Sequence, residues 1–282
     1  LQGENIEWIQ NVYFSSNSCW LFIPDDDEYR GKRVDLEVQP NSGILLDYGI
    51  SSHHLESDLI NLEASGTEWV GNPIPSGNSQ PILLNLGKPK LGTYSSISAR
   101  FRGHSLTKSS LPNHQLSITF GSVNGEQLGS LTSWTGNSSR LFSLSTESIN
   151  LNEGVNIFYI KNISPDNDSY PYLDYFELHY GRELNFDLNY EFQTPISNQD
   201  LRLSFSGEKP SDTRLWNISD PANIIGYEID EEGFCNISSI INEQNRYILF
   251  SENNLTLIKD LTYLNNLSFS LAIDEINIGE PG

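Results

Sequence analysis

The sequence predicts an all-β protein, a jelly-roll-like β-sandwich followed by a second, smaller β domain. Apolar and polar residues alternate with the period of two that is typical of half-buried strands. Clusters of Gly, Pro, Asn and Ser interrupt this alternation at spacings of about 10 residues, as turns do in sandwiches. An apolar stripe of helical spacing does not persist for three turns in any window. Together these patterns indicate stacked sheets whose inner faces bury each other.

The strands follow from the alternation in order along the chain. Ile97, Ala99 and Phe101 alternate with polar residues over 96–102, and the same pattern predicts a strand over 116–120. Asn124-Gly125 follows as the sharpest turn signal, because both residue types tolerate positive φ. Further strands are predicted by the same alternation over 184–192, 201–205 and 267–273.

The length of 282 residues allows two domains, each with its own core. We place the jelly-roll-like sandwich at 67–183, and residues 1–66 form a leading β segment that contributes strands to it or forms a small unit of its own. The second β domain spans 184–282, with a soft boundary near Gly181-Arg182 that no flexible linker marks. The chain begins at Leu1 without Met, so we expect a processed or excised piece of a longer protein.

The charge balance excludes several classes of partner. The chain has 16 Lys and Arg against 37 Asp and Glu, a net charge of −21. Because nucleic acids and anionic lipids bind through basic surfaces, neither is an expected partner. No apolar run approaches the roughly 18 residues of a membrane span, so the chain is not expected to cross a membrane.

The cysteines and histidines form no recognisable catalytic motif. Cys19 and Cys235 are candidates for a long-range disulfide, although two small buried apolar side chains are the simpler interpretation. The histidines lie outside any H-E-x-x-H pair or nucleophile elbow, at His53, His54, His104, His114 and His179. We therefore expect no catalytic residue in this chain.

Two kinds of binding residue stand out. Asp166 and Asp168 in a loop, with Asp174 at the next strand start, offer the oxygen ligands that Ca²⁺ prefers. Trp69 and Trp134 both lie beside turns, where an exposed ring could stack on a sugar. The alternatives are an ordinary polar turn for the aspartates and core packing for the tryptophans. Calcium is the one cofactor suggested, and nothing in the sequence requires it.

The order of several motifs resembles a known family. Each motif is weak alone, but together they cover nearly the whole chain. They are Asn11-Val12-Tyr13-Phe14, Cys19-Trp20-Leu21, His54-Leu55-Glu56-Ser57-Asp58, Thr67-Glu68-Trp69-Val70-Gly71, Trp134-Thr135-Gly136, Leu173-Asp174-Tyr175-Phe176-Glu177, Leu215-Trp216-Asn217-Ile218-Ser219-Asp220-Pro221 and Arg246-Tyr247-Ile248-Leu249-Phe250. This succession resembles the region ahead of the catalytic domain in gingipain-like cysteine peptidases, which include sortase-type members that serve type IX secretion.

The resemblance implies a non-catalytic amino-terminal or pro region of an extracellular or cell-surface peptidase. Its implied partners are the downstream caspase-like catalytic domain of the same precursor and outer-membrane proteins of the secretion system. The family's catalytic His and Cys would follow residue 282, so no catalytic residue is carried over. Two positions depart from the family pattern: Gly181-Arg182 replaces an arginine pair, and Asn217 stands where aspartate is common.

Two other functions fit the same residues. A carbohydrate-binding module would use exposed aromatic rings near Trp69 or Trp134 to hold a glycan. A structural subunit of a surface assembly would need only the self-contained β content and would associate with further copies.

Overall fold

The structure, a computed structural model, describes residues 34–40, 42–62, 68–105, 112–147, 149–187, 189–238 and 244–255. These residues form strands and short 3-10 turns and contain no α-helix, which confirms the predicted all-β class. In this described part of the chain, no helix is long and apolar enough to cross a membrane.

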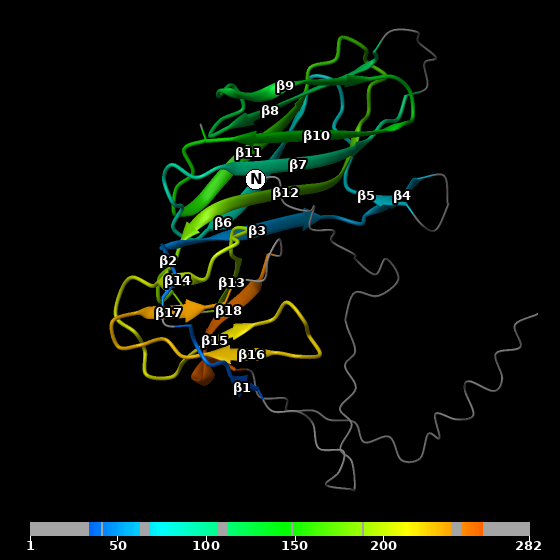
Figure 1. Cartoon of the computed structure of the whole chain (residues 1–282). Coiled ribbons are helices and arrows are strands. Elements are labelled where there is room, and N and C mark those ends of the chain that lie inside the picture. The colour runs from blue at the N-terminus through cyan, green and yellow to red at the C-terminus, as the bar shows by residue number, and fades with distance from the viewer. Residues whose placement is uncertain are drawn as a thin grey trace, which may run out of the picture.

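The largest element is a sheet of nine strands that runs through the whole described fold (Figure 1). Its strands in spatial order are β1 (Asp35–Leu36), β16 (Ile225–Tyr227), β15 (Thr213–Asn217), β18 (Arg246–Ser251), β13 (Tyr190–Gln193), β3 (Tyr48–Glu56), β12 (Tyr172–Glu183), β7 (Ser95–Arg102) and β10 (Ser139–Thr146). Pairing is antiparallel except between β1 and β16, which are parallel.

A four-stranded sheet packs on one half of this large sheet. Its strands in order are β6 (Ser79–Leu86), β11 (Gly154–Asn162), β8 (His114–Phe120) and β9 (Gln127–Trp134). Residues from both sheets form one hydrophobic core, in which Phe101, Phe158 and Phe176 have no exposed surface. The two layers therefore form the expected β-sandwich, and we call this part the first sandwich.

A three-stranded sheet packs on the other half. Its strands in order are β17 (Phe234–Ile237), β14 (Leu201–Ser204) and β2 (Ile44–Leu46). The second core lies between it and the strands β13, β15, β16 and β18, with Leu203, Tyr247 and Leu249 fully buried. A short pair, β4 (Ile60–Asn61) and β5 (Trp69–Val70), lies beside the first sandwich and contacts β12.

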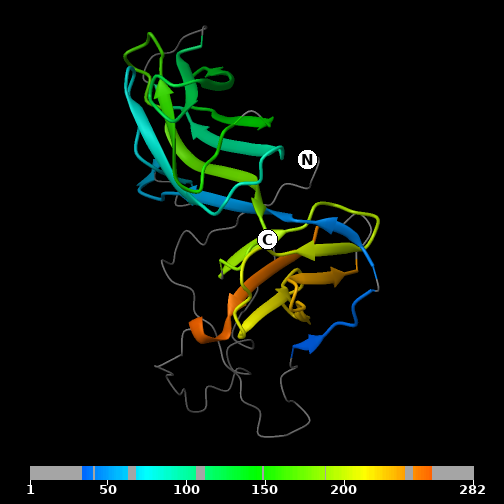
Figure 2. The same cartoon turned by 90° about the vertical axis from the view of Figure 1, so that its left-hand side faces the viewer.

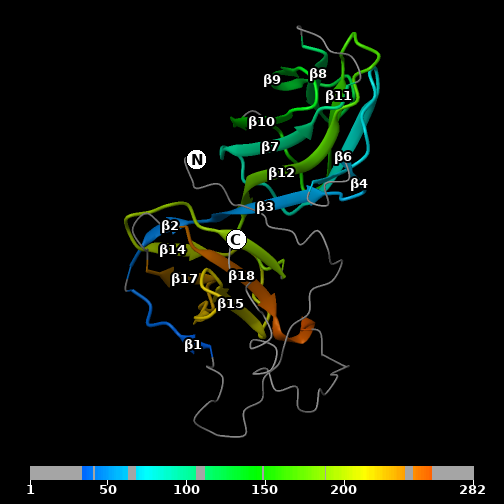
Figure 3. The same cartoon turned by 90° about the vertical axis from the view of Figure 1, so that its right-hand side faces the viewer.

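Strand β3 joins the two halves. It pairs along its whole length with β12 of the first sandwich, and its Ile50 pairs with Gln193 of β13 on the other side. Figures 2 and 3 show β3 running between the group of strands around the first core and the group around the second. Gly49 makes this junction close, because a Cβ there would lie 2.4 Å from Cδ2 of Phe192 in the second core.

Residues before position 67 thus contribute strands to both halves: β3 pairs with β12 of the first, whereas β1 and β2 pair with β16 and β14, strands that follow residue 184. The last member of the first core is Tyr180 and the first of the second is Leu184. The domain boundaries that the sequence suggested stay a prediction.

Most expected strands are confirmed where the structure describes them. The windows 96–102, 116–120 and 201–205 correspond to β7, β8 and β14. The Asn124-Gly125 turn joins β8 to β9, with the Gly125 amide donating to the Ser122 carbonyl at 2.9 Å. Positive φ is found not at this pair but at Gly121 (77°). The expected strand at 267–273 lies outside the described residues.

The expected strand over 184–192 is confirmed only over 190–192 and is wrong for the described residues before Tyr190. β12 ends at Glu183, and β13 begins only at Tyr190. Between them the Asn185 side chain accepts a hydrogen bond from the Asp187 amide at 3.3 Å, and Asn189 has a φ of 69°. Such side-chain bonds to the local backbone favour turns over strands. The alternation instead reflects burial, because Leu184, Tyr190 and Phe192 all face the second core.

Candidate functional site

The outer face of the first sandwich carries a group of ionisable side chains on β3, β12 and β7. Along β12, Phe176, Leu178 and Tyr180 point into the core, so the alternating residues Tyr175, Glu177 and His179 lie on the other face of the sheet. The antiparallel register sets these three opposite Glu56, His54 and Ser52 of β3, and opposite Arg100, Ser98 and Ser96 of β7. We call this set the outer-face cluster.

His54 forms the centre of the cluster because it contacts two carboxylates. Its Nδ1 lies 2.9 Å from Oε1 of Glu177 on β12, and its Nε2 lies 3.1 Å from Oε2 of Glu56 on its own strand. The three side chains keep only 12%, 10% and 18% of their surface exposed, for His54, Glu177 and Glu56 respectively. The Tyr175 ring covers the imidazole at a centroid distance of 5.5 Å.

A second contact in the cluster joins a serine to a histidine. Ser52 Oγ lies 2.7 Å from Nδ1 of His179. Burial lowers the pKa of His179, which favours the neutral ring that a general base requires. Ser52 nevertheless lies within the regular strand β3, whereas the nucleophilic serines of hydrolases sit on sharp turns beside oxyanion donors. The geometry supports a structural hydrogen bond better than a nucleophile.

Asp174 lies at a register shift of β12 beside the cluster. Its Oδ2 is 3.2 Å from Nε of Arg100 on β7. Burial raises the pKa of Asp174 to about 6; Arg100 opposes this rise, and the nearby carboxylates of Glu56, Glu68 and Asp58 add to it. This corner of the sheet therefore concentrates negative charge that is poorly hydrated.

The calcium candidates are not gathered into one site. Asp166 Oδ1 accepts a hydrogen bond from the Asp168 amide at 2.9 Å, the geometry of an ordinary Asx turn, while Asp174 pairs with Arg100. Among the residues that the structure describes, no group of three or more His, Cys, Asp or Glu is placed to hold a metal. Calcium binding stays a prediction that this geometry does not support.

The aspartate loop is held instead by a buried polar network that the sequence did not reveal. His114 has no exposed surface; its Nε2 contacts the Gly136 carbonyl and its Nδ1 contacts Ser169 Oγ, each at 2.9 Å. Asn162, also fully buried, donates to the carbonyls of Ile74 and Ser169. Every one of these residues has the polarity of a surface residue, so sequence alternation alone could not assign it to the interior.

The two tryptophans differ in their surroundings. Trp134 is 7% exposed, stacks on Phe101 and lies 4.8 Å from the His114 ring, so it belongs to the first core. With no free ring face, Trp134 cannot be a sugar platform, which corrects the expectation at this position. Trp69 on β5 is half-buried, and a role in glycan binding stays a prediction there.

Cys235 is a free thiol with 1% exposure in the second core. Burial raises its pKa to about 12, so the thiol stays protonated at neutral pH and is a poor nucleophile. Cys19, its expected disulfide partner, lies outside the described residues. The position of Cys235 on the inner face of β17 fits the simpler interpretation, a small packed apolar side chain.

Comparison with known proteins shows what this fold is similar to. No protein-family model and no curated protein sequence matches the chain. Among solved structures, dimeric latent PorU from Porphyromonas gingivalis matches 79% of this chain with a TM-score of 0.62 and 12% sequence identity. The two chains therefore share a fold over most of the present sequence. This chain spans 22% of the length of that PorU chain.

Smaller likenesses involve carbohydrate-binding modules. A CBM36-1 domain of a xylanase from a termite hindgut metagenome (Trinervitermes trinervoides) covers 45% of this chain at 11% identity, with a TM-score of 0.30. A CBM36 module in complex with calcium and xylotriose gives a TM-score of 0.29. Likeness at this level carries no argument about binding in the present protein.

Part of the outer-face cluster could have been found in the sequence. Every second position of one strand holds Ser52, His54 and Glu56. Every second position of another holds Tyr175, Glu177 and His179. Alternation places each set on one face of its strand. It does not say that the two strands are neighbours, since 127 residues separate Ser52 from His179.

Proposed function

We propose that this chain is a non-catalytic amino-terminal region of a gingipain-like peptidase that scaffolds or masks a catalytic domain following it in the precursor. The observation that carries the proposal is the shared fold with latent PorU over 79% of the chain. The order of the motifs along the sequence supports the proposal independently of the fold.

The site chemistry agrees with a binding role. The Cys235 thiol is buried and protonated, and the Ser52–His179 contact lies within a regular sheet. A continuous nine-stranded sheet across two cores provides a rigid surface. Standard protein interfaces bury about 1,600 Å² in total, which one face of such a sheet with its loops can supply.

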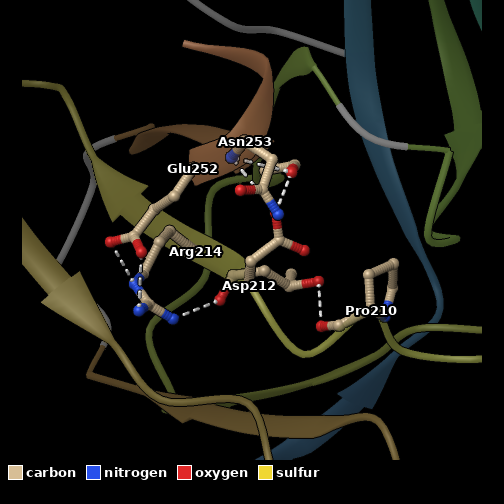
Figure 4. Close-up of polar contacts among 7 residues, drawn as sticks. Pro210, Asp212, Arg214, Glu252 and Asn253 are labelled. Atoms are coloured by element: carbon tan, nitrogen blue, oxygen red, sulfur yellow. Dashed lines mark hydrogen bonds and ion pairs between the residues drawn. The ribbon is translucent and has the colours of Figure 1, made fainter.

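The carboxyl end of the described fold is anchored in a way that suits a following domain. Ser251 ends β18, and its Oγ donates to Oδ2 of Asp212, which also accepts from the Asn253 amide at 3.1 Å. Arg214 donates from Nε and Nη2 to the two carboxylate oxygens of Glu252, at 2.9 and 3.1 Å. Figure 4 shows these contacts on both sides of the short turn Glu252–Asn254. We call them the exit clasp, and propose that it fixes the direction in which the chain leaves the sheet.

The proposal is tested by adding the purified chain to the separately produced catalytic domain of its own precursor. We expect a stable complex by light scattering, together with a lower rate of peptide cleavage if the chain masks the active site. A complex with an unchanged rate would indicate a scaffold. If the two proteins remain separate at micromolar concentration, the proposal is wrong.

The alternative function, a carbohydrate-binding module, can be distinguished from this proposal by one titration with glycans. Sugar stacking on Trp69 would quench Trp fluorescence when a glycan panel is added, and Trp69→Ala would abolish the response. Trp134→Phe is the matched control, because that ring lies in the core. Saturable quenching that depends on Trp69 would favour glycan binding over the role of scaffolding or masking a catalytic domain.

A further inference from the structure

The number of protons that the centre of the outer-face cluster can hold follows from its geometry. Both ring nitrogens of His54 face a carboxylate oxygen, at 2.9 Å for Glu177 and 3.1 Å for Glu56. A neutral imidazole has one N–H donor and one lone pair, and an ionised carboxylate only accepts. With neutral His54, one of the two contacts would set a lone pair against a carboxylate oxygen.

Both contacts become hydrogen bonds when the ring carries two protons. The imidazolium then donates from Nδ1 to Glu177 and from Nε2 to Glu56, and both bonds are charge-assisted. Water can do little to replace them, because each of the three side chains keeps less than a fifth of its surface exposed. Glu177 in particular is 8% exposed as a whole residue, and a carboxylate that deeply placed requires a partner.

The second proton on His54 affects the contact between two strands, because the three residues lie on β3 and β12. His54 and Glu56 belong to β3, the strand that joins the two halves of the large sheet, and Glu177 belongs to β12. The His54–Glu177 contact is thus a side-chain bond between these two strands at a directly paired position. Cross-strand pairs of this kind contribute to holding one strand on another.

We propose that His54, Glu56 and Glu177 form a proton-operated clamp that holds β3 on β12. The clamp is closed while both ring nitrogens of His54 carry a proton. When the pH rises and one proton leaves, the two carboxylates lose their shared counter-charge and this end of β3 is released from β12. The proposal concerns this chain alone and does not rest on its proposed role in a peptidase precursor.

Other charged and titratable groups face the clamp, and their response to pH has to be distinguished from that of His54. Tyr175 and His179 lie on the same face of β12, Arg100 faces them from β7, and Asp174 lies beside Arg100. Burial lowers the pKa of His179, and also that of His53 and His114. These three rings therefore become neutral at a lower pH than an ordinary histidine does.

The test measures the ring and the strand separately in the full chain. Nitrogen-15 NMR of the histidine rings is expected to show two protonated nitrogens on His54 at neutral pH. Hydrogen exchange of the β3 amides over 52–56, corrected for the intrinsic effect of pH, is expected to increase about tenfold as the ring loses its second proton. Loss of the clamp in His54→Gln or Glu177→Gln removes this increase.

His104→Gln is the matched control, since that ring packs on Tyr172 at a centroid distance of 6.2 Å away from the clamp. It should leave the pH dependence of β3 exchange unchanged. A single proton on the wild-type His54 ring at neutral pH would overturn the proposal even if a variant failed to fold. An equal pH response in the wild type, Glu177→Gln and His104→Gln would overturn it as well.

Discussion

Two polar residues of the first sandwich, His114 and Asp174, illustrate how differently burial acts on individual side chains. His114 is fully buried but has a partner for each ring nitrogen, so its interior position is compensated. Asp174 has one cation beside it and several carboxylates, so burial is only partly compensated and its pKa rises to about 6. The first residue stabilises the fold, whereas the second disfavours it once ionised.

His114→Ala is expected to destabilise the protein by about 2 to 4 kcal/mol, because it removes the imidazole contacts to the Gly136 carbonyl and to Ser169 Oγ and opens a cavity. Denaturant unfolding at neutral pH measures this change. His104→Ala, a change of the same size at a half-buried ring, should cost clearly less. Equal costs would show that the buried network does not hold the loop.

Asp174→Asn is expected to stabilise the protein more as the pH rises. The folded state holds the Asp174 proton between its ordinary pKa of 3.8 and about 6, so wild-type stability falls as the pH increases through this range. Asparagine carries no such charge, and the gain should reach about 1 to 2 kcal/mol at neutral pH and vanish near pH 3.8. Thermal unfolding of both proteins across pH checks this, and a constant difference would contradict it.

At the scale of elements, the exit clasp shows which contacts matter at a strand end. Ser251 is 4% exposed and caps the turn Glu252–Asn254, whereas the side chains of Arg214 and Glu252 are 43% and 51% exposed. Exposed ion pairs usually contribute about 1 kcal/mol or less to stability, because water and salt screen them. The buried serine is therefore expected to matter more than the visible ion pair.

Ser251→Ala should cost about 1 kcal/mol of stability, the usual loss for a capping hydroxyl. Glu252→Gln, the matched change in the exposed pair, should cost about 0.5 kcal/mol or less. Urea unfolding compares the two variants, and limited proteolysis reports opening of the turn. A larger loss for Glu252→Gln would reverse this ranking of the two contacts.

For the molecule as a whole, the important feature is that a single sheet serves two cores. Each core has its own opposing sheet, but β3 lies at the border of both. The halves are therefore coupled through backbone pairing and through the close approach of Gly49 to Phe192. A change at this border should be felt on both sides.

Gly49→Ala tests this coupling. The added Cβ would meet the Phe192 ring at 2.4 Å, which forces a buried aromatic side chain to move and should cost about 2 kcal/mol or more. Gly226→Ala is the control, because its Cβ would meet side-chain methyl groups of Leu36 and Val34 at 3.2 and 3.3 Å and the Asp35 carbonyl at an ordinary 3.5 Å. Hydrogen exchange should rise in β13 and β18 for Gly49→Ala. Exchange that changes equally in both variants would argue against a special junction.

The period-two alternation by itself determined the all-β class and the strands β7, β8 and β14, because a sheet buries every second residue whatever its neighbours are. The alternation could not distinguish a strand from a turn at 184–187, since a hydrogen bond between the Asn185 side chain and the Asp187 amide favours the turn there. Nor could it bring His54 and Glu56 to Glu177, or bury His114 and Trp134, because those contacts depend on which distant strands become neighbours. The order of the strands depends on how the two sheets pack against each other, which is a property of the tertiary structure.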